Sequence, residues 1–99
     1  MPDLLTESEI AARLATLPAW SGEGSRISRS LKLRDFAAAM KFVNAVAEVA
    51  ENHNHHPDID IRWNRVKLVL STHSAGGLTE YDFTVAAEID RLAELSGVA

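Results

Sequence analysis

Residues 57–70, with the sequence PDIDIRWNRVKLVL, decide the fold, because apolar and polar side chains alternate along them in two consecutive runs. The apolar members of this alternation are Ile59, Ile61, Trp63, Val66, Leu68 and Leu70. Alternation with a period of two is typical of strands with one buried face, and the pair Asn64-Arg65 leaves room only for a tight connection between the runs. The stretch therefore predicts an antiparallel β-hairpin.

A third strand is predicted upstream, over residues 27–33. Its apolar side chains alternate with serines and a lysine, and one long cationic side chain, Arg29, falls on the otherwise apolar inner row. The turn residues SGEGS (21–25) come before it, so a short edge strand that begins at Trp20 would pair with it. We therefore expect an antiparallel sheet of about four strands.

A central helix is predicted between these strands, because the apolar residues from Phe36 onward recur at helical spacing. Asp35 stands where an N-cap residue is expected. Pro57 disfavours helical geometry at the residue before it, so the helix should end before the pair His55-His56 or within it.

Two further helices are predicted from capping boxes. Thr6-Glu-Ser-Glu9 opens a helix that should run from Thr6 to about Leu17, and Thr79-Glu-Tyr-Asp82 opens a last helix that Gly97 can stop. In both motifs a threonine hydroxyl and an acidic side chain satisfy each other's backbone N–H groups. The chain thus begins and ends with a helix.

The expected order of elements is α-β-β-α-β-β-α. It corresponds to an α+β fold in two layers, an antiparallel sheet with three helices packed on one face. A chain of 99 residues buries one hydrophobic core, so we expect a single domain over residues 1–99. The uncovered face of the sheet, or a free edge, is a natural place for self-association.

Composition and charge exclude several classes of function. The formal net charge of −4 argues against direct contact with nucleic acid, which requires a basic surface. The chain has no cysteine, and therefore neither disulfides nor thiolate metal sites. The N-terminal sequence lacks the features of a signal peptide, and no stretch is long and apolar enough to span a membrane. We expect a cytoplasmic protein.

The histidines are the candidate functional residues. Three of the four lie within residues 53–56, and the fourth is His73. Imidazoles near a helix C-terminus can simply bond its last carbonyl groups. A metal site is a second interpretation, but His55 and His56 are adjacent, so in regular structure their side chains diverge, and no metal-binding spacing joins two of the histidines. We expect no metal and no other cofactor.

Acid–base chemistry is the third interpretation, because an imidazole can give or accept a proton near neutral pH. If the central helix continues to His55, Glu51 lies one turn before it on the same face and would orient it. His73, at the end of the hairpin's second strand, can approach the same place, and Asp82 opens the following helix nearby. Two imidazoles and two carboxylates would then line one small opening.

Four segments together resemble the signature of a known family, the pterin-4a-carbinolamine dehydratases. The matching segments are Glu51-x-x-x-His55-His56-Pro57, Trp63-Asn64-x-Val66, Leu70-Ser-Thr-His73 and Gly77-Leu-Thr-x-x-Asp82. The lone Trp20 and the helix start Asp35-Phe36 are also similar to that family. The resemblance spans nearly the whole chain, and it leaves His53 outside the site.

The resemblance implies that the protein removes water from the hydroxylated pterin (4a-hydroxytetrahydrobiopterin) left by aromatic amino-acid hydroxylases, giving quinonoid dihydropterin. His55, His56 and His73 would be the catalytic residues: His55 and His73 as the main acid–base pair, and His56 mainly binding and orienting the pterin, with a share in the proton transfer as a further role. Glu51 would tune the first imidazole, and Asp82 would support His73 or contact the heterocycle. Asp82 also has a purely structural interpretation, as the third residue of its capping box.

The resemblance also implies a small set of supporting residues and partners. Pro57 and Trp20 complete the expected site, although Trp20 has core packing as its alternative. A homodimer or homotetramer is expected, with a functional link to an aromatic amino-acid hydroxylase. The alternative class is a non-catalytic module of the same fold. Such a module would bind a pterin or molybdopterin, or would act as a dimerisation partner of a homeodomain transcription factor.

Overall fold

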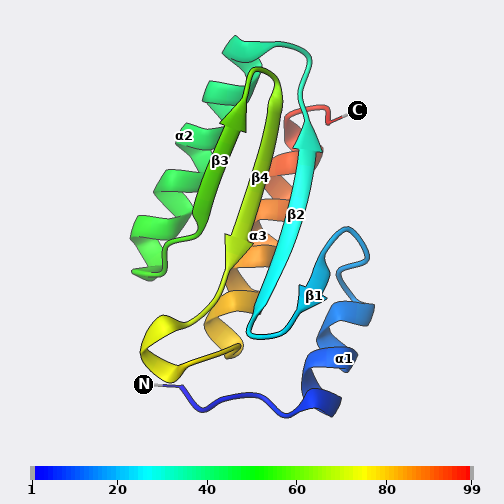
Figure 1. Cartoon of the computed structure of the whole chain (residues 1–99). Coiled ribbons are helices and arrows are strands. Elements are labelled where there is room, and N and C mark those ends of the chain that lie inside the picture. Colours follow the sequence, from blue (N-terminus) through cyan, green and yellow to red (C-terminus); the bar gives the residue numbers. More distant parts are fainter. Residues whose placement is uncertain (1, 99) are drawn as a thin grey trace.

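The computed structural model describes residues 2–98. Within that range the chain forms three α-helices, four strands and one short 3-10 helix, η1, and their order follows the predicted α-β-β-α-β-β-α (Figure 1). The elements are α1 (Glu7–Ala15), β1 (Ser21–Glu23), β2 (Arg26–Lys32), α2 (Phe36–His53), β3 (Asp58–Arg62), β4 (Arg65–Leu70), η1 (His73–Ala75) and α3 (Glu80–Leu95).

The four strands form one antiparallel sheet in the order β1-β2-β4-β3. The predicted hairpin β3–β4 is confirmed, but its turn falls one residue earlier than expected, on Trp63-Asn64. Trp63 adopts the left-handed backbone conformation with φ 49° and is 66% exposed, so its predicted place on the inner row is wrong. The buried Asn64 explains the shift, because its side-chain amide donates to the Leu33 carbonyl at 2.9 Å.

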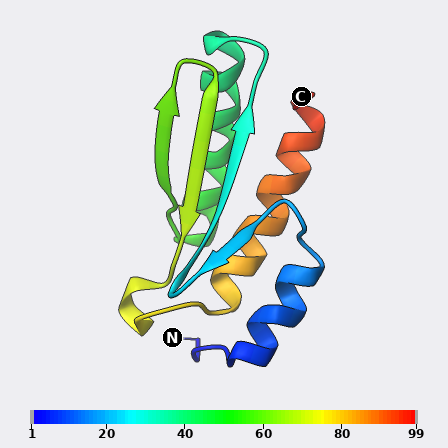
Figure 2. The ribbon, with the colours of Figure 1, turned by 45° about the vertical axis from the view of Figure 1, so that its right-hand side comes forward.

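Helices α2 and α3 lie side by side on one face of the sheet, as Figures 1 and 2 show from two directions. Helix α1 packs beside β1 at the margin of the same core, where Leu14 lies against the backbone of Gly22. The largest fully buried side chains of the core are Phe42, Ile27, Leu33, Leu68, Leu70 and Ile89. No helix among residues 2–98 covers the opposite face of the sheet.

The predicted helix starts are confirmed. Thr6 and Thr79 each open their helix with a complete capping box, and the Asp35 carboxylate accepts the N–H of Ala38 at 2.8 Å. None of the helices in residues 2–98 combines the length and apolar character that crossing a membrane requires.

A partly buried polar cluster lies at the margin of the core. Arg29, predicted on the inner row of its strand, donates from Nη1 to Asp90 of α3 at 2.5 Å. The indole Nε1 of Trp20 donates to the same carboxylate oxygen at 2.8 Å. Asp90 therefore joins the segment before β1, the inner row of β2 and the middle of α3.

Replacing Asp90 should cost the fold measurable stability. Asp90→Ala leaves the Arg29 guanidinium and the Trp20 indole without their shared acceptor, and hydrogen bonds to charged groups contribute about 1.5–3 kcal/mol. We expect the free energy of unfolding, measured by urea denaturation, to fall by about 2–3 kcal/mol. Glu94→Ala, an exposed change on the same helix, should shift it by less than about 0.5 kcal/mol. Equal denaturation midpoints for the two variants would contradict this account.

Candidate active site

The histidine segment lies where α2 ends. Asn54 follows the helix in the left-handed conformation with φ 48°, and its N–H bonds the carbonyls of Ala50 and Glu51. This cap stops the helix before His55, which is one of the two outcomes allowed by Pro57. The next residues, His55 and His56, consequently leave the helix in different environments. His55 is buried, whereas His56 is exposed.

Asp82 holds His55 from the start of α3. The Nε2 atom of His55 lies 2.6 Å from Oδ1 of Asp82, a carboxylate with no exposure to solvent. Its other oxygen, Oδ2, accepts the Thr72 hydroxyl at 2.8 Å and the Thr79 N–H at 2.9 Å. The capping carboxylate thus binds the end of β4, the start of α3 and the histidine segment at once.

The second ring nitrogen of His55, Nδ1, is not fully enclosed by the protein. Nδ1 makes no hydrogen bond, and within residues 2–98 no buried side-chain nitrogen or oxygen lacks a partner. His55 is 8% exposed in total, so Nδ1 belongs to the small part of the residue that reaches the surface. The ring of Tyr81 packs against it at a centroid distance of 5.7 Å. One nitrogen held by a carboxylate and the other free is the arrangement of an oriented general acid or base.

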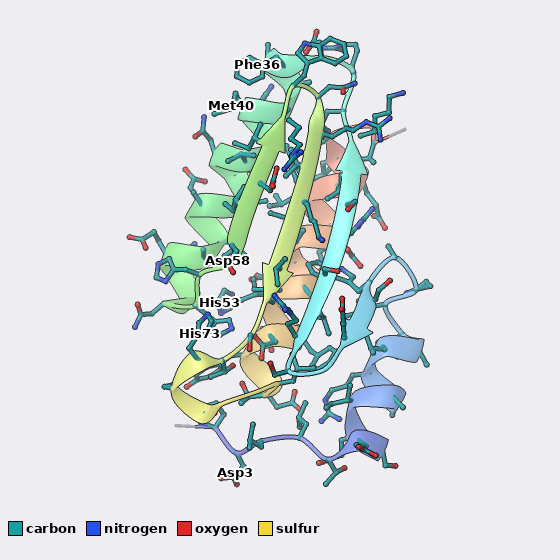
Figure 3. The ribbon with its side chains drawn as sticks, viewed as in Figure 1. Asp3, Phe36, Met40, His53, Asp58 and His73 are labelled. Carbon is teal, nitrogen blue, oxygen red and sulfur yellow. The ribbon has the colours of Figure 1, made fainter. Side chains whose placement is uncertain are left out.

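His56 and His73 line one hollow of about 200 Å³, which we call the active-site hollow. It lies at the end of the sheet, between the segment before β3 and the loop after β4, where Figure 3 labels Asp58 and His73. The loop is closed by a bridge between Thr72 and Gly77, with the Thr72 N–H donating to the Gly77 carbonyl at 2.9 Å. The lining residues are Ser25, Arg26, His56, Asp58, Val69, Ser71, His73 and Gly76.

The carboxylate partners differ from those predicted. Glu51 contacts His56, with 2.5 Å between Oε2 and Nε2, and does not contact His55. The proposed Glu51–His55 pair required the helix to continue to His55, and Asn54 ends it earlier. Likewise Asp82 bonds His55, whereas the sequence suggested that it would support His73 or contact the heterocycle.

The remaining predicted positions are distributed as follows. Trp20 is buried in the core on Asp90 and is not among the residues that line the active-site hollow. Pro57 is half-buried and links His56 to Asp58 of β3. His53, which the sequence left outside the site, is the last residue of α2 and pairs with Glu88 of α3.

Each of the clustered histidines therefore has its own carboxylate. The pairs are His53–Glu88, His55–Asp82 and His56–Glu51. Among residues 2–98 no group of three or more histidine and acidic side chains is arranged to hold a metal ion. An imidazole paired with one carboxylate is suited to hold or transfer a proton.

Several residues of the site were not predicted. Arg26, Ser25 and Ser71 line the active-site hollow, and the Ser71 hydroxyl donates to the Ser25 carbonyl at 2.6 Å. Their proximity depends on the pairing of β2 with β4, which no local pattern specifies. Thr72 could have been found, because a hydroxyl at a strand end beside His73 is placed to contact the capping acid.

Comparison with known proteins identifies relatives along nearly the whole chain. The family model described as pterin 4 alpha carbinolamine dehydratase matches residues 3–92. A protein of Acidobacterium capsulatum with the provisional name pterin-4-alpha-carbinolamine dehydratase is 58% identical over 88 residues, which cover 89% of this chain and 96% of that protein. A protein of Nocardia farcinica with the same provisional name is 52% identical over 91 residues, covering 92% of this chain and 96% of its own.

Two solved structures share the fold. The transcriptional coactivator/pterin dehydratase of Brucella melitensis superposes with a TM-score of 0.89 at 38% identity, covering 92% of this chain and 99% of its own. A pterin dehydratase-like protein, described as a RuBisCO assembly factor in the alpha-carboxysome, reaches a TM-score of 0.62 at 24% identity. It covers 75% of this chain and 86% of its own, and its likeness concerns the fold alone.

The buried pair predicts a coupled loss of stability. Asp82→Ala leaves His55, Thr72 and the Thr79 N–H without their acceptor, and breaking a buried pair costs about 3–5 kcal/mol of unfolding free energy. A double-mutant cycle with His55→Ala, measured by urea denaturation, should give a coupling energy of about 1–3 kcal/mol. Strict additivity of the two changes would show that the His55–Asp82 contact carries no energy.

Proposed function

The chain belongs to the pterin-4a-carbinolamine dehydratase family, and on that premise we propose that it dehydrates a pterin-4a-carbinolamine by histidine acid–base catalysis. The observation that supports this most is the placement of the histidines. His56 and His73 line one hollow, and Asp82 holds His55 beside the strand end that carries His73.

The reaction breaks one bond to oxygen and transfers two protons. The hydroxyl on ring-fusion carbon 4a takes a proton and leaves as water. The adjacent ring nitrogen, N5, loses its proton, and the electron pair of that N–H bond forms the new N5=C4a double bond. The product is quinonoid dihydropterin plus water, without net oxidation or reduction. One acid and one base beside the ring are therefore sufficient.

His55 and His73 are the proposed acid–base pair. The carboxylate of Asp82 fixes the His55 ring through Nε2, which leaves Nδ1 to exchange the proton. His73 stands at the start of η1 on a loop that the Thr72–Gly77 bridge closes. Either assignment of acid and base to these two imidazoles completes the elimination.

His56 is the proposed binding residue for the pterin ring. It is more exposed than His55, and its partner Glu51 is itself on the surface. A surface ion pair of this kind contributes little to the stability of the fold. The proposed role of the Glu51–His56 pair is therefore to orient the His56 ring at the active-site hollow.

The wider biological role is also a proposal. We propose a cytoplasmic homodimer or homotetramer that recycles the tetrahydropterin of an aromatic amino-acid hydroxylase. An assembly is favoured by β3, an edge strand of the sheet, on which Ile59 is 37% exposed.

Substitution of the two proposed proton-transfer residues tests the mechanism. Positioned general acids and bases contribute about 10²–10⁴-fold each, so His55→Ala and His73→Ala should each lower the dehydration rate by at least ~10²-fold. His53→Ala is the matched control, because His53 pairs with Glu88 on the helix side. It should leave the rate nearly unchanged. Equal losses in all three variants would overturn the assignment.

The non-catalytic alternative, a module that binds a pterin without turning it over, predicts a different outcome. Stopped-flow ultraviolet spectroscopy follows the hydroxylated pterin directly. A dehydratase accelerates decay of that intermediate in proportion to protein concentration. A passive binder slows the decay or leaves it unchanged, and that result would contradict the proposed function.

A further inference from the structure

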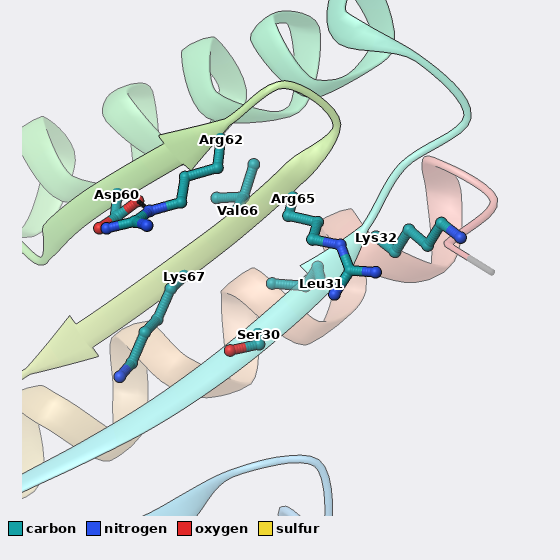
Figure 4. A pocket seen from close by; sticks show the side chains of 8 residues that line it. All are labelled: Ser30, Leu31, Lys32, Asp60, Arg62, Arg65, Val66 and Lys67. Carbon is teal, nitrogen blue, oxygen red and sulfur yellow. Dashed lines mark hydrogen bonds and ion pairs between the residues drawn. The ribbon is translucent and has the colours of Figure 1, made fainter.

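The uncovered face of the sheet carries a cluster of positive charge, which we call the cationic strip (Lys32, Arg62, Arg65 and Lys67). The strand register places Arg62 opposite Arg65, and Arg65 opposite Lys32, so three cations stand in one row across three neighbouring strands. With Ser30 and Asp60, the strip lines a hollow of about 510 Å³ (Figure 4).

This arrangement is unfavourable for the sheet by itself, because like charges directly opposite one another destabilise a pair of strands. Within residues 2–98, Asp60 pairs with Arg62 at 3.1 Å, while Lys32, Arg65 and Lys67 form no ion pair. The chain as a whole carries a net charge of −4, so the strip is a local exception. Unpaired cations around a hollow form a site complementary to an anion.

The cationic strip adjoins the active-site hollow. Asp58 opposite Val69, and Asp60 opposite Lys67, are successive pairs on the same face of the β3–β4 hairpin. Asp58 and Val69 line the active-site hollow, and Asp60 and Lys67 line the cationic hollow. Two strand residues span about 7 Å, so the two hollows lie within reach of one small molecule. Figure 4 shows Lys67 extended along β4 toward its C-terminal end, where the active-site hollow lies.

Resting on the dehydratase function proposed above, we propose that the cationic strip binds a phosphate group on the side chain of the pterin. The substrate class is then a pterin whose side chain ends in a phosphate, with the ring at the histidines and the phosphate at the strip. Phosphate oxygens accept strong hydrogen bonds from guanidinium and ammonium groups. The volume of the cationic hollow also falls within the range of small-molecule sites, about 300–1,000 Å³.

A binding comparison tests this directly. The probes are two fully oxidised, fluorescent pterins with the same trihydroxypropyl side chain, one of them with a terminal phosphate. Exposed charge contacts contribute up to about fivefold in affinity each, so we expect the phosphorylated pterin to bind at least about tenfold more tightly at low salt. The difference should shrink at about 1 M salt, where the screening length falls to ~3 Å.

Matched variants test which residues produce the preference for the phosphorylated pterin. The triple change Lys32→Gln, Arg65→Gln and Lys67→Gln should abolish the preference for phosphate and leave the affinity for the neutral pterin unchanged. Lys41→Gln removes one exposed charge from α2, on the helix side, and should preserve the preference. Equal affinities of the unaltered protein for the two pterins would overturn the proposal. A loss of preference in Lys41→Gln as large as in the triple variant would do the same.

Turnover is scored separately with the two 4a-hydroxylated tetrahydropterins. If the protein accelerates dehydration of neither, the dehydratase function fails, while the binding comparison still decides whether the strip holds the phosphate. If it dehydrates both, the phosphorylated substrate should have the lower KM, and the triple variant should remove that difference. Equal KM values for the two substrates count against the strip and leave the dehydratase function standing.

Discussion

A carboxylate removed from water must find its hydrogen-bond donors inside the protein, and this constraint organises one whole end of the molecule. Asp82 has no exposed surface, and its three donors are the Thr79 N–H, the Thr72 hydroxyl and the His55 ring. Those donors belong to three structural segments, the start of α3, the end of β4 and the residues after α2, and the last of these is 27 residues from Asp82 in sequence. A buried charge without partners costs several kcal/mol, so the segments are held in one arrangement.

The end of α2 gives consecutive histidines separate surroundings. Asn54 turns the chain out of the helix, with the result that His53 faces α3, His55 enters the interior and His56 stays on the surface. A continued helix would have kept His55 one turn after Glu51. The single left-handed residue therefore decides which imidazole receives the buried carboxylate and which receives the exposed one.

Much of the fold could be predicted from the sequence, because its signals are local. Capping boxes, the Asp35 cap and the alternation in residues 58–70 each depend on neighbours within a few positions. The errors concern contacts between distant segments. Trp63 fits the alternation, yet the buried amide of Asn64 binds Leu33 and moves the turn onto the tryptophan.

The same limit applies to the site. The histidine motif identified His55, His56 and His73, but their carboxylate partners depend on where a helix stops and where another begins. Arg26 enters the active-site hollow through strand pairing alone, so no sequence pattern indicated it. For Trp20 the family pattern suggested a place near the site and its apolar character suggested core packing; the structure buries it in the core, where its indole nitrogen donates to the partly buried Asp90.

The two tryptophans give the molecule a pair of opposed optical reporters. Trp20 is 4% exposed and Trp63 is 66% exposed. Denaturation should therefore shift the emission of Trp20 to longer wavelength, while the emission of Trp63 hardly changes. Trp63 stands between Arg62 and Arg65 in the sequence. Quenching of its fluorescence therefore reports on the binding of a ligand at the hairpin end of the sheet. The emission wavelength thus reports on unfolding of the core, and quenching reports on ligand binding at the uncovered face of the sheet.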